Sequence, residues 1–279
     1  MEQTLSKIRN LYDTLGRGER KIADWLLAHP AELISLSISE VASVCGCGDA
    51  TVIRFAKRLG LSGYQELKIN VAREMGGNLT GNLAFSPEDT VMDVYNKHIA
   101  DIKITLDETR AYLNPTAMEQ SAEALRNARS ISIIGLGNSA PIAQDAAHKF
   151  LRAGLPASAY SDNHMQMIVT SHLGPGDVVM AISHSGSSVD IVSALERAKA
   201  NGATTICITN HGKSPVDKHS DYLLYTNAQE TKYSILAMTS RIAQLAVIDT
   251  LYSYIVIRGG DTISQAIHST EEALESKKY

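Results

Sequence analysis

Four serines lie close together in residues 183–188 (SHSGSS). This stretch follows the apolar run 178–182 and precedes a segment with helical periodicity, which predicts a loop between a buried strand and a helix. Serine hydroxyls and the free N–H groups at the start of a helix donate hydrogen bonds without the need for a lysine or arginine. The stretch therefore predicts a neutral site for a small phosphate group. The alternative is a loop that only caps the helix.

A glycine-containing stretch, residues 135–140 (GLGNSA), lies in the same position between the apolar run 131–134 and another predicted helix. Such a loop is predicted to bind an anion at the start of the helix. Its G-x-G-x-x-A spacing also fits a dinucleotide fingerprint, with Asp162 at the distance expected for a ribose-binding carboxylate. A dinucleotide fold does not require the serine stretch, which therefore favours a phosphate site over a nicotinamide cofactor.

A basic surface is predicted on a helix over residues 49–59. Thr51, Arg54 and Arg58 recur at i, i+3 and i+7, which places them on one side. Apolar residues recur on the opposite side, which is predicted to pack into a core: Val52, Phe55, Ala56 and Leu59. A capping box from Ser37 to Glu40 opens the preceding helix, and residues 46–48 (GCG) form a tight turn between the two. This order is typical of a helix-turn-helix.

The second helix of such a motif enters the major groove of DNA and contacts bases through its first residues. The predicted base contacts are Ala50, Thr51 and Arg54. The predicted phosphate contacts are Arg58 and Lys68, with Lys57 beside them. The alternative is the solvated face of an ordinary amphipathic helix.

Two kinds of domain are needed to carry these sites. Residues 1–77 are predicted to be all helical, and residues 78–123 to hold a linker at 81–87 and two connecting helices at 90–112 and 115–128. In residues 124–260, short apolar runs at 131–134, 156–160, 177–183, 204–209 and 222–226 alternate with helices, the last of them at about 234–256. This alternation predicts a parallel sheet with helices on both faces. Residues 261–279 are predicted to form a C-terminal helix.

The composition is that of a globular chain long enough for two domains, with 279 residues, 44% of them hydrophobic, and a net charge of -4. No run approaches the roughly 18 apolar residues of a membrane span, and the first residues lack the pattern of a signal peptide. A cytoplasmic protein without a membrane partner is expected. Cys45, Cys47 and Cys207 suggest no disulfide framework. Cys45 and Cys47 are expected to be small buried residues rather than metal ligands, and no metal or cofactor is predicted.

Residues 38–68, and residues 19–30 (ERKIADWLLAHP), resemble the N-terminal domain of RpiR-type regulators. The resemblance is carried above all by residues 50–55 (ATVIRF) and 59–64 (LGLSGY), and it extends over essentially all of residues 1–77. It implies that this domain binds double-stranded operator DNA. One departure is Cys47-Gly48, where that family has an apolar residue and then serine. Gly48 is a weaker helix cap than serine, by a few tenths of a kcal/mol.

Residues 135–140, 181–192 and 240–252 resemble the SIS, or sugar isomerase, domain, over about residues 124–256. The resemblance implies that a phosphate is held by one set of groups: the hydroxyls of Ser183, Ser185 and Ser188, and the amides of Gly186 and Ser187. It implies sugar contacts from Asn138 and Ser139, next to Gly137. Glu230 stands where related enzymes place an acid/base carboxylate, and here it is expected to accept hydrogen bonds from sugar hydroxyls. Asp162 and His164 are further candidates for sugar contacts.

A helix-turn-helix domain followed by a SIS domain is the RpiR arrangement. The fold expected is therefore an all-α helix-turn-helix domain followed by an α/β SIS domain. The function implied is that of a homo-oligomeric regulator of sugar-metabolism genes, not an enzyme, whose affinity for DNA depends on a bound phosphorylated sugar. Two alternatives remain. One is a sugar-phosphate isomerase with an accessory helical domain, supported by Glu230, and the other is a nicotinamide-linked regulator that uses residues 135–140.

Overall fold

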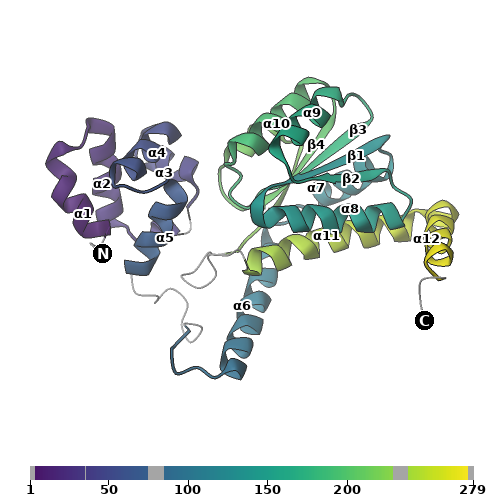
Figure 1. Cartoon of the computed structure of the whole chain (residues 1–279), viewed down its shortest axis with the longest axis horizontal. Helices are drawn as coiled ribbons and strands as arrows, with labels where there is room; N and C mark the ends of the chain where they lie inside the picture. The colour runs from purple at the N-terminus through teal and green to yellow at the C-terminus, as the bar shows by residue number, and fades with distance from the viewer. Residues whose placement is uncertain (1–3, 35, 75–84, 229–237, 276–279) are drawn as a thin grey trace. The chain divides into compact units, whose positions relative to one another are not determined.

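The computed structural model describes residues 4–34, 36–74, 85–228 and 238–275, which form two units (Figure 1). Most of the first unit comes from residues 4–105, and most of the second from residues 106–275. The change from an all-helical to a mixed α/β pattern confirms the fold class expected from the sequence.

The first unit packs five α-helices around one apolar core. Their bounds are α1 Thr4–Leu11, α2 Arg17–Ala28, α3 Ile38–Val44, α4 Asp49–Arg58 and α5 Tyr64–Glu74. Each helix contributes apolar side chains at helical spacing, such as Ile22 and Leu26 of α2 and Val52 and Phe55 of α4, all of them fully buried. The helices are short, so their stability comes from this shared burial rather than from intrinsic propensity.

The predicted turn between α3 and α4 is present. The Ser37 side chain accepts a hydrogen bond from the Glu40 amide, and the Glu40 carboxylate accepts one from the Ser37 amide at 2.7 Å. Gly46 has φ +60°, the left-handed conformation that ends a helix without the steric cost of a Cβ atom. Burial raises the pKa of the Cys45 thiol to about 11, so this side chain packs as a neutral apolar group.

The second unit is built on a five-stranded parallel sheet of order β2-β1-β3-β4-β5. The strands are β1 Ser130–Gly135, β2 Ala157–Tyr160, β3 Asp177–Ile182, β4 Thr204–Asn210 and β5 Tyr222–Thr226. The helices are α6 Val91–Tyr112, α7 Pro115–Arg126, α8 Ala140–Arg152, α9 Asn163–His172, α10 Val189–Ala200, α11 Met238–Arg258 and α12 Gly260–Glu275. Only the last part of α6 belongs to this unit.

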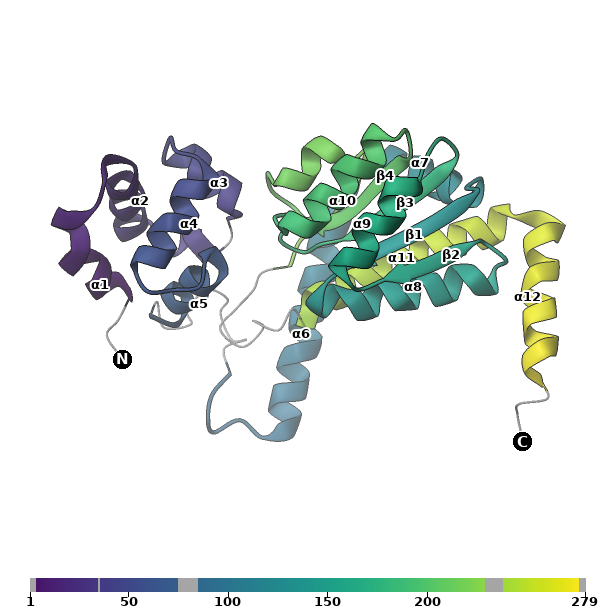
Figure 2. The same ribbon diagram turned by 45° about the horizontal axis from the view of Figure 1, so that its top comes forward.

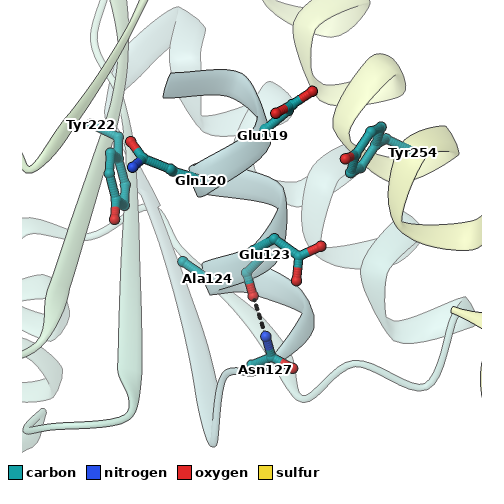
Figure 3. A pocket seen from close by; sticks show the side chains of 7 residues that line it. All are labelled: Glu119, Gln120, Glu123, Ala124, Asn127, Tyr222 and Tyr254. Atoms are coloured by element: carbon teal, nitrogen blue, oxygen red, sulfur yellow. Dashed lines mark hydrogen bonds between the residues drawn. The ribbon is translucent and has the colours of Figure 1, made fainter. Parts of the chain in front are cut away.

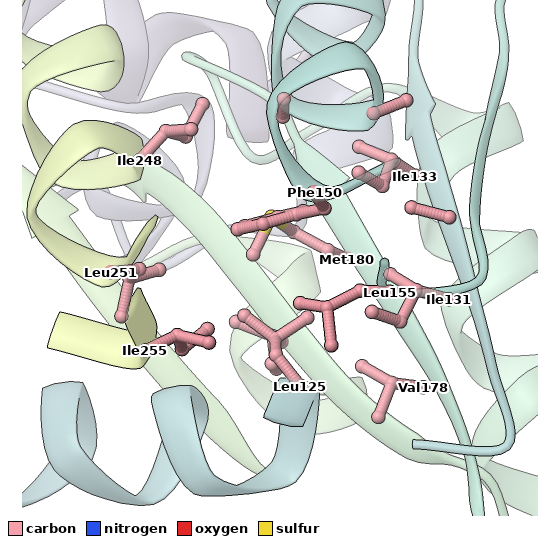
Figure 4. Close-up of a cluster of buried hydrophobic side chains, with 14 of the residues drawn as sticks. Leu125, Ile131, Ile133, Phe150, Leu155, Val178, Met180, Ile248, Leu251 and Ile255 are labelled. Carbon is pink, nitrogen blue, oxygen red and sulfur yellow. The ribbon is translucent and has the colours of Figure 1, made fainter. Parts of the chain in front are cut away.

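Helices cover both faces of the sheet, as the continuous apolar runs of the strands require (Figure 2). Alternate strand residues point to opposite faces. Ile133 and Met180 join the core beneath α7, α8 and α11, where Phe150 is fully buried (Figure 4). Ile134 and Val179 join the core beneath α9 and α10.

The sheet unit extends beyond the expected boundary at residue 124. Ala122 and Leu125 of α7 lie in the core, and Leu113 packs against it. A boundary at residue 124 would therefore cut through a core helix. At the other end, Ile263 of α12 is buried in the same core, and an ion pair between Arg152 and Glu271 at 2.9 Å joins α12 to the end of α8. The helix predicted from residue 261 thus packs on this unit.

Membrane spans can be judged only for the part of the chain that the structure describes. No single helix there has both the length and the hydrophobicity of a span. Helices α11 and α12 satisfy the criteria only when taken together, and they are bent by 114° at their junction.

The buried carboxylate of Asp177 is expected to make stability depend on acid pH. Arg129 donates two hydrogen bonds to it at 2.9 and 2.5 Å, and the Gly174 amide and Ser130 hydroxyl add one each at 2.9 Å. The Arg129 hydrogen bonds are the main cause that lowers the Asp177 pKa to about 2, against about 3.9 in an unfolded chain.

This stabilisation is present above about pH 4 and is lost as the pH falls from there towards 2, because the unfolded chain then takes up a proton that the folded state still excludes. Asp177→Asn is expected to lower the free energy of unfolding by about 1.5 kcal/mol at pH 7 and to flatten its decline below pH 4. Urea unfolding at pH 7, 4 and 3 measures both. An unchanged pH profile in Asp177→Asn would contradict the assignment.

Candidate functional site

The outer face of α4 is open to solvent along its length. Ala50, Arg54 and Lys57 are exposed, and Thr51 is half-buried, while the opposite face lies in the core. The Arg54 guanidinium donates a hydrogen bond to the Thr51 hydroxyl at 3.3 Å. The helix therefore presents a polar and basic strip to solvent. In a helix-turn-helix, the N-terminal residues of the second helix contact the bases.

Arg58 and Lys68, the two predicted phosphate contacts, both interact with other groups of the protein. The Arg58 guanidinium donates to the Glu19 carboxylate at 3.1 Å and to the Thr14 carbonyl oxygen at 2.5 Å. Arg58 thus joins α4 to the first turn of α2 and to the segment before it, and its side chain is 43% exposed. Lys68 is half-buried in α5 and takes part in an interaction within the protein. Sequence spacing could not reveal the Arg58 pair, because its partner lies 39 residues away.

The serine loop and the glycine loop leave the sheet side by side. Gly135, the last residue of β1, pairs with Ile182, the last residue of β3, so residues 136–139 and 183–188 begin at the same level of adjacent strands. In the order β2-β1-β3-β4-β5, the chain turns to opposite sides after β1 and β3. The crevice at this reversal is where parallel sheets bind ligands. The structure therefore brings the two predicted loops together.

Several groups of the serine loop are engaged or covered: the Ser187 hydroxyl donates to the Ser185 carbonyl oxygen at 3.0 Å, Ser183 is buried, and two amides bond within the loop. The Gly186 amide donates to the Ser183 carbonyl at 3.1 Å, and the Ser187 amide donates to the Ser185 hydroxyl oxygen at 3.3 Å. Both of these amides, which the family resemblance implies as phosphate donors, thus have acceptors within the loop. Ser188 begins α10 without a side-chain cap bond, so its hydroxyl is not consumed by the helix. The first amides of α10 lack acceptors within the helix.

Backbone hydrogen bonds hold the underside of the serine loop in place. The Ser183 amide donates to Ile208 of β4 at 3.0 Å, and the Asn210 amide donates to the His184 carbonyl at 3.0 Å. The Val216 amide donates to the Gly186 carbonyl at 3.2 Å. A loop anchored in this way meets a ligand with its donors already placed, which reduces the entropic cost of binding.

The glycine loop needs its glycines for steric reasons. A Cβ atom on Gly135 would lie 2.7 Å from the Ser139 carbonyl oxygen, and Gly137 has φ +55°. Gly137 and Asn138 are exposed, and Ser139 begins α8 without a side-chain cap bond. These three residues follow β1 at the strand end next to the serine loop.

Three further candidates for sugar or ribose contacts are Asp162, His164 and Glu230. One Asp162 oxygen accepts the Met165 amide at 2.9 Å and caps α9, so this residue has a structural role and fits poorly as a ribose-binding acid. His164 is exposed in the first turn of α9. Asn163 donates to Asp190 of α10 at 3.3 Å, which joins the start of α9 to the end of the serine loop. Glu230 lies outside the described residues.

A separate hollow of about 440 Å³ lies among α7, β5 and α11 (Figure 3). Tyr222, the first residue of β5, lines it, so it is near the end of the sheet opposite to the two loops. Glu119 and Glu123 line it as well, and two carboxylates would repel a phosphate dianion. This hollow is therefore unsuited to a phosphorylated ligand.

Two family models match the chain. The helix-turn-helix domain of the rpiR family matches residues 2–77, and the SIS domain matches residues 124–254. The two matches cover the basic helix, the glycine loop and the serine loop.

Relatives match over the full length. An HTH-type transcriptional regulator of Caldanaerobacter subterraneus subsp. tengcongensis is 37% identical over 285 residues, which cover 100% of this chain and 99% of the relative. HexR, an HTH-type transcriptional regulator of Pseudomonas aeruginosa, is 32% identical over 280 residues, covering 100% and 98%. The structure of Vibrio vulnificus NanR complexed with ManNAc-6P aligns over 99% of both chains with a TM-score of 0.82, and at 20% identity this shows a shared fold.

Proposed function

Because the chain belongs to the rpiR family of helix-turn-helix transcriptional regulators, we propose that α4 binds operator DNA and that a phosphorylated sugar at the sheet crevice changes the affinity for that DNA. The observation that carries this proposal is the pairing of Gly135 with Ile182, which places two donor-rich loops at one crevice. Neutral donors at helix starts suit a phosphate group. The recognition helix lies in the same chain.

The effector is proposed to bind through its phosphate to the hydroxyls of Ser183, Ser185 and Ser188. Its sugar part would lie towards Gly137, Asn138 and Ser139, which are at the neighbouring strand end. The NanR structure contains ManNAc-6P, so amino-sugar phosphates belong among the first compounds to test. Hydroxyl recognition depends on geometry at the sugar end, and the test therefore includes hexose and pentose phosphates.

A path of contacts leads from the serine loop to α6, the helix that precedes the sheet unit in the chain. Asn210 holds the His184 carbonyl, and the next residue, His211, packs its ring 3.9 Å from that of Tyr112 at the end of α6. Tyr225 packs edge-on against His211 at 5.5 Å. We infer that a shift of the serine loop on ligand binding is passed to α6 through this aromatic cluster.

Tyr112→Ala is expected to reduce the coupling between ligand and DNA without abolishing either binding event, because it removes the ring stacked on His211. In coupled systems, one ligand typically changes the affinity for the other by about 5- to 150-fold. The ratio of operator Kd values with and without phosphosugar is expected to move towards 1 in this variant. Tyr95→Ala is the matched control, since Tyr95 lies on the same helix and is 56% exposed. An unchanged ratio in Tyr112→Ala would exclude this path.

We further propose that the chain acts as a homo-oligomer. A two-fold dimer would place two α4 helices on half-sites about one helical turn apart, and the operator would then have two-fold symmetry. A footprint confined to one half-site, with no second half-site about one helical turn away, would contradict this part of the proposal.

A thermal-shift panel is the first test of the ligand site. Each phosphosugar is compared with its unphosphorylated parent, and NAD and NADP are included. A ligand at 100 times its Kd stabilises the folded state by about 2.7 kcal/mol. Stabilisation by a phosphosugar but not by its parent is expected. Stabilisation by a dinucleotide alone would favour the nicotinamide alternative. The capping role of Asp162 speaks against that alternative, because the carboxylate expected to bind a ribose already accepts a hydrogen bond from the Met165 amide.

We infer a regulator rather than an isomerase, because a recognition helix serves DNA binding and serves no step of isomerisation. The isomerase alternative rests on Glu230. NMR of aldose and ketose phosphates incubated with the protein tests it, and we expect no conversion above the blank. Conversion that disappears in Glu230→Gln would overturn the inference.

A further inference from the structure

A basic hollow of about 460 Å³ opens beside the recognition helix within the helical unit. It is lined by the first turn of α2 and by the outer face of α4: Gly16, Arg17, Gly18, Glu19, Thr51, Arg54 and Arg58. Three of these seven residues are arginines, contributed by two helices. Arg17 lies well before the helix-turn-helix in the sequence, so the spacing of residues on α4 gives no sign of it.

The first turn of α2 approaches α4 closely. A Cβ atom on Gly18 would lie 3.2 Å from the Thr51 Cγ2 atom, which is tighter than most side-chain contacts. The absence of a side chain at Gly18 therefore allows the α2 backbone to lie against the N-terminal half of the recognition helix. An anion bound in the hollow would be adjacent to the residues predicted to contact bases.

The side chains that line the hollow carry a net positive charge, from three arginines and one glutamate. Glu19 is its acidic member, and one oxygen of its carboxylate accepts hydrogen bonds from the Gly16 amide at 2.9 Å and from Arg58 at 3.1 Å. The Glu19 charge is thus balanced by Arg58. Arg17 is exposed and, among the residues that the structure describes, makes no ion pair or side-chain hydrogen bond. Arg54 bonds only the neutral Thr51 hydroxyl there.

We infer that this hollow seats a backbone phosphate of the operator DNA, and that Arg17 is its principal cation. The inference rests on the proposed binding of α4 to the major groove, because that geometry brings a phosphate of the groove edge next to the helix. A guanidinium suits a phosphate oxygen pair. Such a contact fixes the position of α4 on the duplex without reading sequence.

A phosphate contact and a base contact are distinguished by their dependence on salt and on sequence. Each neutralised phosphate adds about 0.9 to the slope of log K against log salt concentration. Arg17→Ala is expected to weaken binding about 3- to 10-fold at low salt, equally for operator and for scrambled duplex, and to reduce the slope by about 1.

The experiment uses the full chain and a duplex recovered from a random library by selection, with fluorescence anisotropy at several salt concentrations. Arg20→Ala is the matched control: Arg20 lies one turn further along α2, is exposed, donates to the Asp13 carbonyl and does not line the hollow. Arg17→Lys keeps the charge and is expected to retain most of the affinity and the wild-type slope.

The outcomes separate this inference from the proposed function. A reduced slope in Arg17→Ala but not in Arg20→Ala supports the phosphate seat. Wild-type binding to the selected duplex with the same slope in both variants overturns the seat and leaves the proposed function standing. If Arg17→Ala loses affinity only for duplexes that carry one particular operator base pair, Arg17 contacts a base, and the phosphate seat is overturned. Failure of the wild-type chain to bind any duplex overturns both.

Discussion

Replacement of Ser185 by glutamate is expected to abolish the response to phosphosugar, with a rise in Kd of more than about 100-fold. The substitution removes a neutral donor and places a carboxylate where the phosphate would lie. Two unit charges 4 Å apart repel by about 4 kcal/mol near a protein surface, and a phosphate carries more than one charge. Calorimetric titration with the compound identified by the thermal-shift panel measures the loss.

Two further variants make this result interpretable. Ser185→Ala removes one hydroxyl without adding charge and is expected to cost about 1 kcal/mol, or roughly fivefold in Kd. Ser253→Glu places the same charge on an exposed position of α11, away from the loops, and is expected to leave binding unchanged. Wild-type affinity in Ser185→Glu, with an unchanged melting temperature, would show that the phosphate binds elsewhere.

Arg54→Ala is expected to lower operator affinity by about 1–3 kcal/mol, or roughly 5- to 150-fold, with a much smaller loss on scrambled duplex. The reason is that Arg54 is exposed near the middle of α4, and a guanidinium can bond two acceptors of one base. Anisotropy titrations with both duplexes measure the discrimination directly.

The Arg54→Lys variant separates base recognition from simple charge. Lysine keeps the charge but lacks the paired donor geometry of arginine, so discrimination is expected to stay low in Arg54→Lys. Arg110→Ala removes an arginine that is exposed on α6, and it is expected to bind both duplexes as the wild type does. Equal losses on operator and scrambled duplex in Arg54→Ala would reassign Arg54 to phosphate contact.

The periodic parts of the fold could be predicted from the sequence because one residue pattern determined each element. The basic helix expected at 49–59 is α4, Asp49–Arg58, and the apolar run at 131–134 is the centre of β1, Ser130–Gly135. The capping box at Ser37 and the left-handed Gly46 were equally local features. The order of the strands in the sheet depends on contacts between distant segments, so no local residue pattern predicts it.

Features that depend on tertiary packing could not be predicted. The pairing of Arg58 with Glu19 is one such feature, because the two residues lie 39 positions apart in the sequence. The basic hollow around Arg17 forms only because α2 packs against α4. The sequence thus predicts which residues form the two candidate sites, and the structure shows which of their groups already have partners within the protein.

Phosphosugar binding is expected to change the affinity of the protein for operator DNA. A titration of the operator with the protein measures this change. Operator Kd is measured by anisotropy with the full chain, without ligand, with a saturating phosphosugar from the panel, and with its unphosphorylated parent. We expect the operator Kd to change by about 5- to 150-fold with the phosphosugar and to stay the same with the unphosphorylated parent sugar. An identical Kd at a phosphosugar concentration that saturates the thermal shift would contradict it.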